Sequence, residues 1–147
     1  MSLKVRLMEE LKISMKNGDK LRKNVITMVR AAIKQIEVDS RIELNDEAII
    51  DVISKQVKQK KDAIEDFEKG QRQDLVELTK NEIDILLNYL PQQLTESELD
   101  EIVKAAIQEV GAISIKDMGK IMSNVMPKIK GRADGSMVNS IVKQYLK

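Results

Sequence analysis

Glycine and proline, the residues that most often interrupt helices, are scarce in this chain. The sequence holds 6 glycines and 2 prolines among 147 residues. Between them, apolar residues recur every three to four positions, which is the spacing of an amphipathic α-helix and not of a strand. The sequence therefore predicts an all-α protein whose helices are interrupted at or near the following residues: Gly18, Gly70, Pro91, Gly111, Pro127 and Gly131.

Composition narrows the chemistry further. Aromatic residues make up only 2% of the chain, so the predicted core is built from Leu, Ile, Val and Met. The sequence has no cysteine and no histidine, which excludes thiol catalysis, disulfides, imidazole bases and the common zinc sites. It also has no phosphate-binding loop, dinucleotide fingerprint or nucleophile–base pair. We therefore expect a protein that is not an enzyme and that holds no cofactor or metal.

The same patterns predict a cytoplasmic protein. Charges recur every few residues from Lys4 onward, so the first residues lack the apolar stretch of a secretory signal peptide. No apolar run approaches the ~18 residues of a transmembrane helix.

The N-terminal part of the chain predicts four helices with short links, which favours antiparallel neighbours. Ser2, Asp19 and Asn45 are suited to cap the first three helices. The first is expected over residues 3–17 and the fourth over residues 73–88. The inward rows are predicted to be Leu3, Leu7, Leu11 and Met15 in the first helix, and Leu21, Val25, Met28, Ala32 and Ile36, widened by Val29 and Ile33, in the second.

A domain boundary is predicted at Pro91-Gln92-Gln93-Leu94, because the residue before a proline disfavours a helix. It divides the chain into an N-terminal helical domain, residues 1–91, and a small three-helix domain, residues 95–147. Thr95 and Glu98 have the spacing of a capping box at the start of the second domain.

The second of its helices contains two unusual residues. Gly119 is interpreted as a point of close approach by another helix, with approach by a ligand as the alternative, because a helical glycine costs about 1 kcal/mol relative to alanine. Pro127 either kinks this helix or divides it, so residues 116–135 form one kinked helix or two. The last helix is expected to bury Val138, Ile141, Val142 and Tyr145.

Positive charge is concentrated at the C-terminal end. Residues 110–147 hold seven basic and two acidic side chains, a net charge of +5 in a chain whose total is +1. Lys128, Lys130 and Arg132 precede a predicted helix start and could contact an extended phosphate backbone. Asp134 argues against a closed anion pocket, since its carboxylate would cap the same amides. The alternative is a solvated basic loop between two helices.

Several segments taken together resemble the YqeY family, which is related to the C-terminal tail domain of the GatB subunit of aspartyl/glutamyl-tRNA amidotransferase. They are Lys58-Gln59-Lys60-Lys61-Asp62, Gly70-Gln71-Arg72-Gln73-Asp74-Leu75, Tyr89-Leu90-Pro91-Gln92-Gln93-Leu94, Asp117-Met118-Gly119-Lys120, Met126-Pro127 and Lys130-Gly131-Arg132-Ala133-Asp134-Gly135. The resemblance covers the whole chain. It implies a helical N-terminal domain followed by a small helical tail domain that helps to hold tRNA.

The resemblance also implies phosphate contacts and partners. It places those contacts on Lys116, Lys120, Lys128, Lys130, Arg132 and Lys143. The GatB-type tail has Gly-Lys-Ala-Asn-Pro where this chain has Gly131-Arg132-Ala133-Asp134-Gly135, so an acid replaces a neutral amide. The partners implied are tRNA and an amidotransferase or aminoacyl-tRNA synthetase. The catalytic part of the amidotransferase is absent from this chain.

Two functions are therefore expected. The first is a non-catalytic tRNA-binding accessory module. The second is a protein-interaction adaptor without nucleic-acid binding, favoured by the broad apolar face of the second helix and by the shortage of aromatic residues on which bases could stack.

Overall fold

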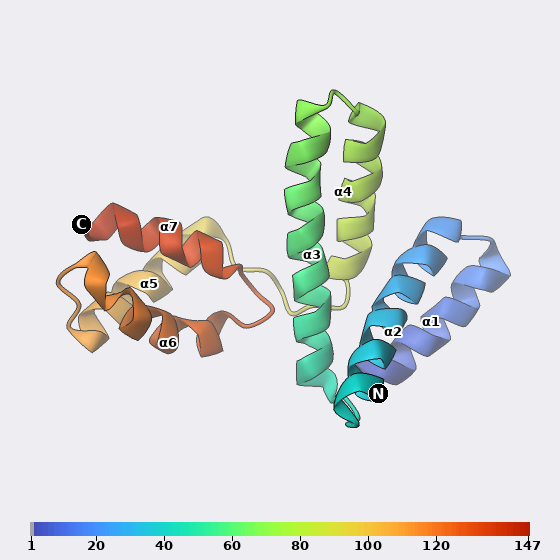
Figure 1. The fold of residues 1–147 in the computed structure, drawn as a ribbon, viewed down its shortest axis with the longest axis horizontal. Coiled ribbons are helices and arrows are strands. Elements are labelled where there is room, and N and C mark those ends of the chain that lie inside the picture. Colours follow the sequence, from blue (N-terminus) through green and yellow to red (C-terminus); the bar gives the residue numbers. More distant parts are fainter. Residues whose placement is uncertain (1) are drawn as a thin grey trace. The chain divides into compact units, whose positions relative to one another are not determined.

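The computed structural model describes residues 2–147, and all regular structure among them is helical. The predicted all-α class is confirmed. The chain divides into two compact units, Met1–Leu90 and Pro91–Lys147. The helices are coloured along the sequence in Figure 1. Because compactness does not prove independent folding, the predicted domains 1–91 and 95–147 stay a prediction.

The first unit contains four helices arranged as two antiparallel pairs (Figure 1). Their bounds are α1 Leu3–Asn17, α2 Lys20–Ser40, α3 Asp46–Lys69 and α4 Gln73–Leu87. The predicted caps are present: the side chains of Ser2, Asp19 and Asn45 accept hydrogen bonds from the first-turn amides of α1, α2 and α3. Gly18 ends α1 in the left-handed conformation, with a φ of 70°.

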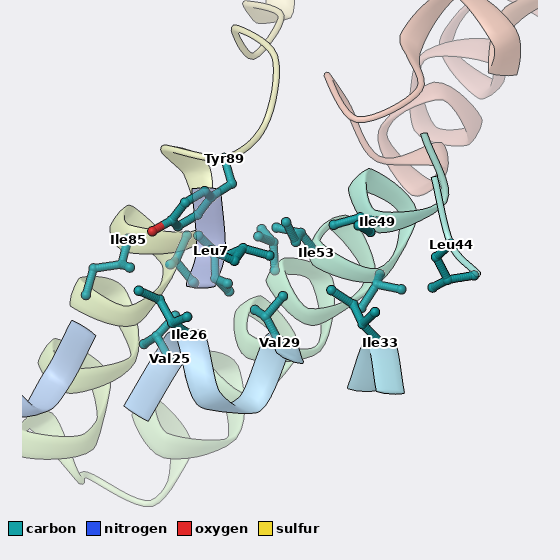
Figure 2. Packing of buried hydrophobic residues seen from close by; sticks show 14 residues of the cluster. Leu7, Val25, Ile26, Val29, Ile33, Leu44, Ile49, Ile53, Ile85 and Tyr89 are labelled. Atoms are coloured by element: carbon teal, nitrogen blue, oxygen red, sulfur yellow. The ribbon is translucent and has the colours of Figure 1, made fainter. Parts of the chain in front are cut away.

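The core of the first unit lies between its four helices. Figure 2 shows Leu7 of α1, Ile26 of α2 and Ile53 of α3 close to Tyr89, which follows α4. Leu7, Ile26 and Ile53 have no exposed surface. Burying such a side chain contributes roughly 1.5–3 kcal/mol. Aliphatic packing therefore stabilises this unit, as the composition predicts.

Two predicted inward rows are partly wrong. In α1, Met15 is 59% exposed, whereas Ser14 is buried and donates a hydrogen bond to the carbonyl of Glu10. In α2, Met28 is 50% exposed and Ile36 is also exposed. In α1, a row taken at every fourth residue turns by roughly 40° per step relative to a 3.6-residue helix, so its last member, Met15, leaves the core. The buried residues of α2 are Val25, Ile26, Val29 and Ile33.

The second unit contains three helices and a short 3₁₀ turn. Their bounds are α5 Glu96–Val110, η1 Ile115–Asp117, α6 Met118–Ile129 and α7 Gly135–Tyr145. The predicted capping box between Thr95 and Glu98 is present at the start of α5. The core residues of this unit are Leu99, Val103, Ala106, Ile121, Val125, Ile129, Val138, Ile141 and Val142.

The structure answers the question about residues 116–135. Helix α6 continues through Pro127 to Ile129, and α7 is a separate antiparallel helix (Figure 1). Pro127 removes one helical hydrogen bond, but only two helical residues follow it. Gly131, with a φ of 74°, forms the turn, and Asp134 caps α7 as predicted.

Candidate functional site

The six predicted phosphate-contacting residues all lie in the second unit, where α6 separates them into two groups. Lys128, Lys130 and Arg132 lie at or just after the C-terminal end of α6. Lys116 and Lys120 lie at its N-terminal end, and Lys143 lies near the end of α7, which returns to η1. The 12 residues of α6 span roughly 18 Å at the standard rise. The two groups therefore have different surroundings.

Arg132 is built into the fold of the turn after α6. Its Nε donates to the carbonyl of Gln92 at 3.3 Å, and its own carbonyl accepts from the amide of Leu94 at 2.9 Å. The side-chain amide of Gln93 donates to the carbonyl of Gly131 at 2.7 Å. We call these three hydrogen bonds, which join Gln92–Leu94 to Gly131–Arg132, the turn clasp. The two segments come from separate motifs of the family resemblance, and the turn clasp gives both a structural role.

Arg132 also lies near the start of α5. The pKa of Glu98 is below its usual range, chiefly because the amide of Thr95 donates to its carboxylate, and additionally because of the positive charge of Arg132. The guanidinium is therefore held by the turn clasp and lies close enough to Glu98 to stabilise its charged carboxylate. This arrangement favours a positioning role for Arg132 over a dedicated phosphate contact.

Lys128 is also engaged within the unit. Its Nζ lies 2.9 Å from Oδ1 of Asn124 and 3.5 Å from Oε2 of Glu109. Both members of the ion pair with Glu109 are well exposed, so the pair contributes little stability. Lys128 can therefore exchange this partner for another anion, and Lys130, which follows α6, is exposed to solvent.

The start of α7 is closed to an anion by its own cap. Oδ1 of Asp134 accepts from the amide of Ser136 at 3.1 Å, and Oδ2 accepts from the Ser136 hydroxyl at 2.9 Å. A carboxylate thus occupies the position that a phosphate would take at a helix N-terminus. The expectation that Asp134 prevents a closed anion pocket agrees with this geometry.

The other group of basic residues is open to solvent. Lys116 in η1, Lys120 in the first turn of α6 and Lys143 near the end of α7 are all exposed. The amide of Ile115 donates to the carbonyl of Lys147 at 3.1 Å, which brings the end of α7 beside η1. We call Lys116, Lys120 and Lys143 the open lysines.

Asp117 places a negative charge near Lys120, one of the open lysines. Its Oδ2 accepts from the amide of Ile113 at 3.0 Å and from that of Ser114 at 3.4 Å. The first of these bonds is the chief reason that the pKa of Asp117 is lowered, and Lys120 lowers it further. Within residues 2–147 the side chains of Lys116 and Lys143 make no hydrogen bond or ion pair.

The sequence pattern places Tyr145 incorrectly. The pattern predicts a buried residue in α7, but Tyr145 is 42% exposed. Its hydroxyl donates to Oδ1 of Asp100 at 2.7 Å, and Nζ of Lys104 lies 5.6 Å from its ring centroid. The hydrogen bond to Asp100 is the chief reason that the pKa of Tyr145 is raised. The sequence does offer one signal for this exposure, because Tyr145 is the last residue of α7. A tyrosine at a helix end can pack its ring against the protein and keep its hydroxyl at the surface.

The interpretation of Gly119 as a point of close helix approach is wrong. A Cβ atom added there would meet no atom within 4 Å outside the local backbone of its own helix. The glycine lies on an open part of α6, beside Lys120. Packing within the second unit therefore does not require it.

The described residues hold no candidate for two other kinds of site. Among residues 2–147, no three acidic side chains are grouped so that they could hold a metal ion. In the same range, no helix combines the length and the apolar character that crossing a membrane requires.

Comparison with known proteins supports the family resemblance. The model of the family described as Yqey-like protein matches residues 4–146. A relative from Pyrenophora tritici-repentis, named "Altered inheritance of mitochondria protein 41, mitochondrial", is 34% identical over 146 residues, covering 96% of this chain and 79% of the relative. Proteins of the same name from Lachancea thermotolerans and Kluyveromyces lactis are 36% and 34% identical, covering 95% and 96% of this chain and 79% and 80% of their own lengths.

These names contradict the prediction of a cytoplasmic protein, because each of the three relatives is named as mitochondrial. The prediction rested on the absence of cysteine, of a secretory signal pattern and of a long apolar run. Proteins of more than one reducing compartment share those features, so they do not separate the cytoplasm from the mitochondrion. The match of the family model over residues 4–146, together with these relatives, shows that the chain belongs to the YqeY-like protein family.

Proposed function

We propose that this chain is a non-catalytic RNA-binding accessory module that holds tRNA through its second unit. The observation that carries the proposal is the group of open lysines, in a segment with a net charge of +5. Lysines without strong internal partners can neutralise phosphates at little cost to the fold, and phosphate contacts supply most of the affinity of such proteins.

The proposed contacts differ from one basic residue to the next. The open lysines contact phosphates directly, and Lys128 and Lys130 extend the positive surface along α6. Arg132 acts as a positioning residue through the turn clasp. The exposed ring of Tyr145 offers a face on which a base can stack.

The choice of tRNA and of a partner comes from the family resemblance. A GatB-like tail acts beside an enzyme, so we propose that this chain presents tRNA to an amidotransferase or an aminoacyl-tRNA synthetase. The catalytic chemistry then belongs to that enzyme. The names of the relatives mention neither tRNA nor an activity.

Filter binding of the full chain to bulk tRNA and to duplex DNA, at low and at moderate salt, tests the proposal. We expect submicromolar binding that prefers tRNA. Neutralising about four phosphates predicts a slope of about −3 in a plot of log affinity against log salt concentration. Equal binding to both nucleic acids, or no binding, would contradict the proposal.

Charge variants then locate the interface. The triple variant Lys116→Gln/Lys120→Gln/Lys143→Gln should weaken tRNA binding at least tenfold and make the salt slope shallower by about 2–3. A matched control, Lys12→Gln/Lys55→Gln/Lys61→Gln, removes three exposed charges from the first unit and should bind as the wild type does. Equal losses in both variants would mean that only the total charge matters.

The second candidate function is a protein-interaction adaptor. The specific observation in its favour is that the first unit exposes large apolar side chains on both helices of its first hairpin and just after it, including Ile13, Met15, Val38 and Ile42. A salt-insensitive complex with a protein, combined with an absence of tRNA binding, would favour this function.

A further inference from the structure

The first unit has a groove of about 470 Å³ between α1 and α2. Its floor is apolar: Leu7 and Ile33 are buried at its base, and Leu11 of α1 and Ala31 of α2 are the apolar lining residues that solvent reaches. Leu7 and Ile33 belong to the core, so the floor is fixed by the packing of the unit. The groove is open to solvent along the helices, and Ala31, at its edge, is exposed.

One wall of the groove carries unneutralised positive charge. Arg30 and Lys34 both line it and lie four residues apart on α2, so they share a face of that helix. Both are exposed, and their side chains make no hydrogen bond or ion pair within residues 2–147. Like charges at this spacing destabilise a helix slightly, and nothing in the fold of the unit offsets them. An anionic partner would offset the repulsion between Arg30 and Lys34.

The other charged residues of the groove neutralise each other at one end. Lys4 forms an ion pair with Glu37, whose carboxylate also accepts from the amide of Leu44 at 2.8 Å. The hydrogen bond from Lys4 is the chief reason that the pKa of Glu37 is lowered, so this carboxylate stays charged. The net positive charge of the groove therefore comes from Arg30 and Lys34.

Methionines border the groove on the α1 side. Met8 and Met15 follow Lys4 and Leu11 at four-residue intervals, so they lie on the adjoining face of α1, and both are exposed. Methionine is flexible and polarisable, and it is common on surfaces that accept varied apolar partners. The groove thus has an apolar side on α1 and a cationic side on α2.

We propose that this groove docks an acidic amphipathic helix of a partner protein. The apolar stripe of that helix lies on Leu11 and Ala31, the apolar lining residues that solvent reaches, and two carboxylates four residues apart face Arg30 and Lys34. An open groove between antiparallel helices suits a third helix, whereas a small ligand needs a site that encloses most of its surface. The apolar floor favours protein over RNA, because a phosphate backbone has no apolar stripe to bury.

Fluorescence anisotropy with the full chain tests this proposal. The probe is a fluorescein-labelled synthetic helix of about 18 residues, with leucines at i, i+3, i+4 and i+7 and glutamates four residues apart beside that stripe. A second probe has glutamine in place of each glutamate. We expect the acidic probe to bind at least tenfold more tightly than the glutamine probe. Equal binding of the two probes would overturn the proposal.

Two variants place the probe in the groove. Arg30→Glu/Lys34→Glu should weaken binding of the acidic probe at least tenfold, whereas Lys55→Glu/Lys61→Glu, the same charge change on α3, should not. Ala31→Gln fills the edge of the groove with a good helix former and should weaken binding without lowering the melting temperature. Unchanged affinity in both groove variants would overturn the proposal.

A competition experiment separates this groove from an RNA surface. Bulk tRNA should not displace the acidic probe, and Arg30→Glu/Lys34→Glu should retain tRNA binding through the second unit. Displacement of the probe by tRNA, together with loss of tRNA binding in that variant, would assign Arg30 and Lys34 to RNA and overturn the docking proposal. The outcome is independent of the tRNA test on the open lysines, which uses other residues.

Discussion

Two dipeptides of the second unit, Gly119-Lys120 and Gly131-Arg132, have the same chemistry and opposite structural roles. Gly131 has a φ of 74°, and Arg132 takes part in the turn clasp. Gly119 lies in a regular helix with open space around it, and Lys120 is exposed. The comparison teaches that a glycine beside a basic residue does not identify a binding surface. Exposed basic residues that take no part in holding the fold together are better candidates for a binding surface.

The turn clasp should give the largest effect. Fragments 91–147 and 95–147 differ by Pro91–Leu94, and the shorter one loses all three clasp hydrogen bonds. At about 1 kcal/mol each, they predict a loss of about 3 kcal/mol in the free energy of unfolding, measured by urea titration with circular dichroism.

The same experiment tests the predicted domain boundary. If fragment 91–147 is unfolded, the second unit does not fold alone, and Gln93→Ala in the full chain then measures one clasp bond, at about 1 kcal/mol. Equal stability of the two fragments would show that the clasp contributes nothing.

Gly131→Ala should destabilise the second unit by about 1–2 kcal/mol. A side chain in the left-handed region brings its Cβ close to the neighbouring backbone carbonyl, and alanine has no polar group to compensate. Urea unfolding measures the change, and tRNA binding of the folded protein should be unaffected. A neutral result would mean that the turn relaxes without losing stability.

Gly119→Ala should have the opposite sign and a smaller size, a gain of about 1 kcal/mol. Alanine is a better helix former than glycine, and the added Cβ meets nothing within 4 Å. If the variant is stabilised but loses tRNA affinity, the backbone at Gly119 approaches a ligand. If the variant is destabilised, the surroundings of Gly119 in solution do not leave room for a Cβ atom.

Asp117→Asn should give the smallest effect, visible only in its pH dependence. Because the folded pKa of Asp117 is lowered, chiefly by the amide of Ile113, its carboxylate stabilises the fold above the unfolded pKa. That contribution is lost as the pH falls through the folded value, in the acid range below about pH 4. The variant should therefore lose less stability than the wild type as the pH falls through this acid range, as measured by thermal unfolding. If the stabilities of the variant and the wild type fall in parallel with pH, the carboxylate of Asp117 does not contribute to the acid dependence of stability.

Part of the candidate site could be predicted and part could not. Local patterns correctly predicted the caps at Asp134 and Thr95, because each involves residues within three positions of one another. The positive charge of residues 110–147 was also visible in the sequence. The separation of its basic residues into a structural and an open group was not, because the partner of Arg132 lies 40 positions away, at Gln92.

By itself, the sequence determined the helices, since capping residues and apolar periodicity act within one or two turns of the chain. It also determined the family. Tertiary structure alone decided which members of each apolar row are buried, that Tyr145 is exposed beside Asp100, and that Arg132 belongs to the turn clasp. The physical reason is that these outcomes depend on neighbours that are distant in the sequence, and only the packed helices bring those neighbours within hydrogen-bonding distance.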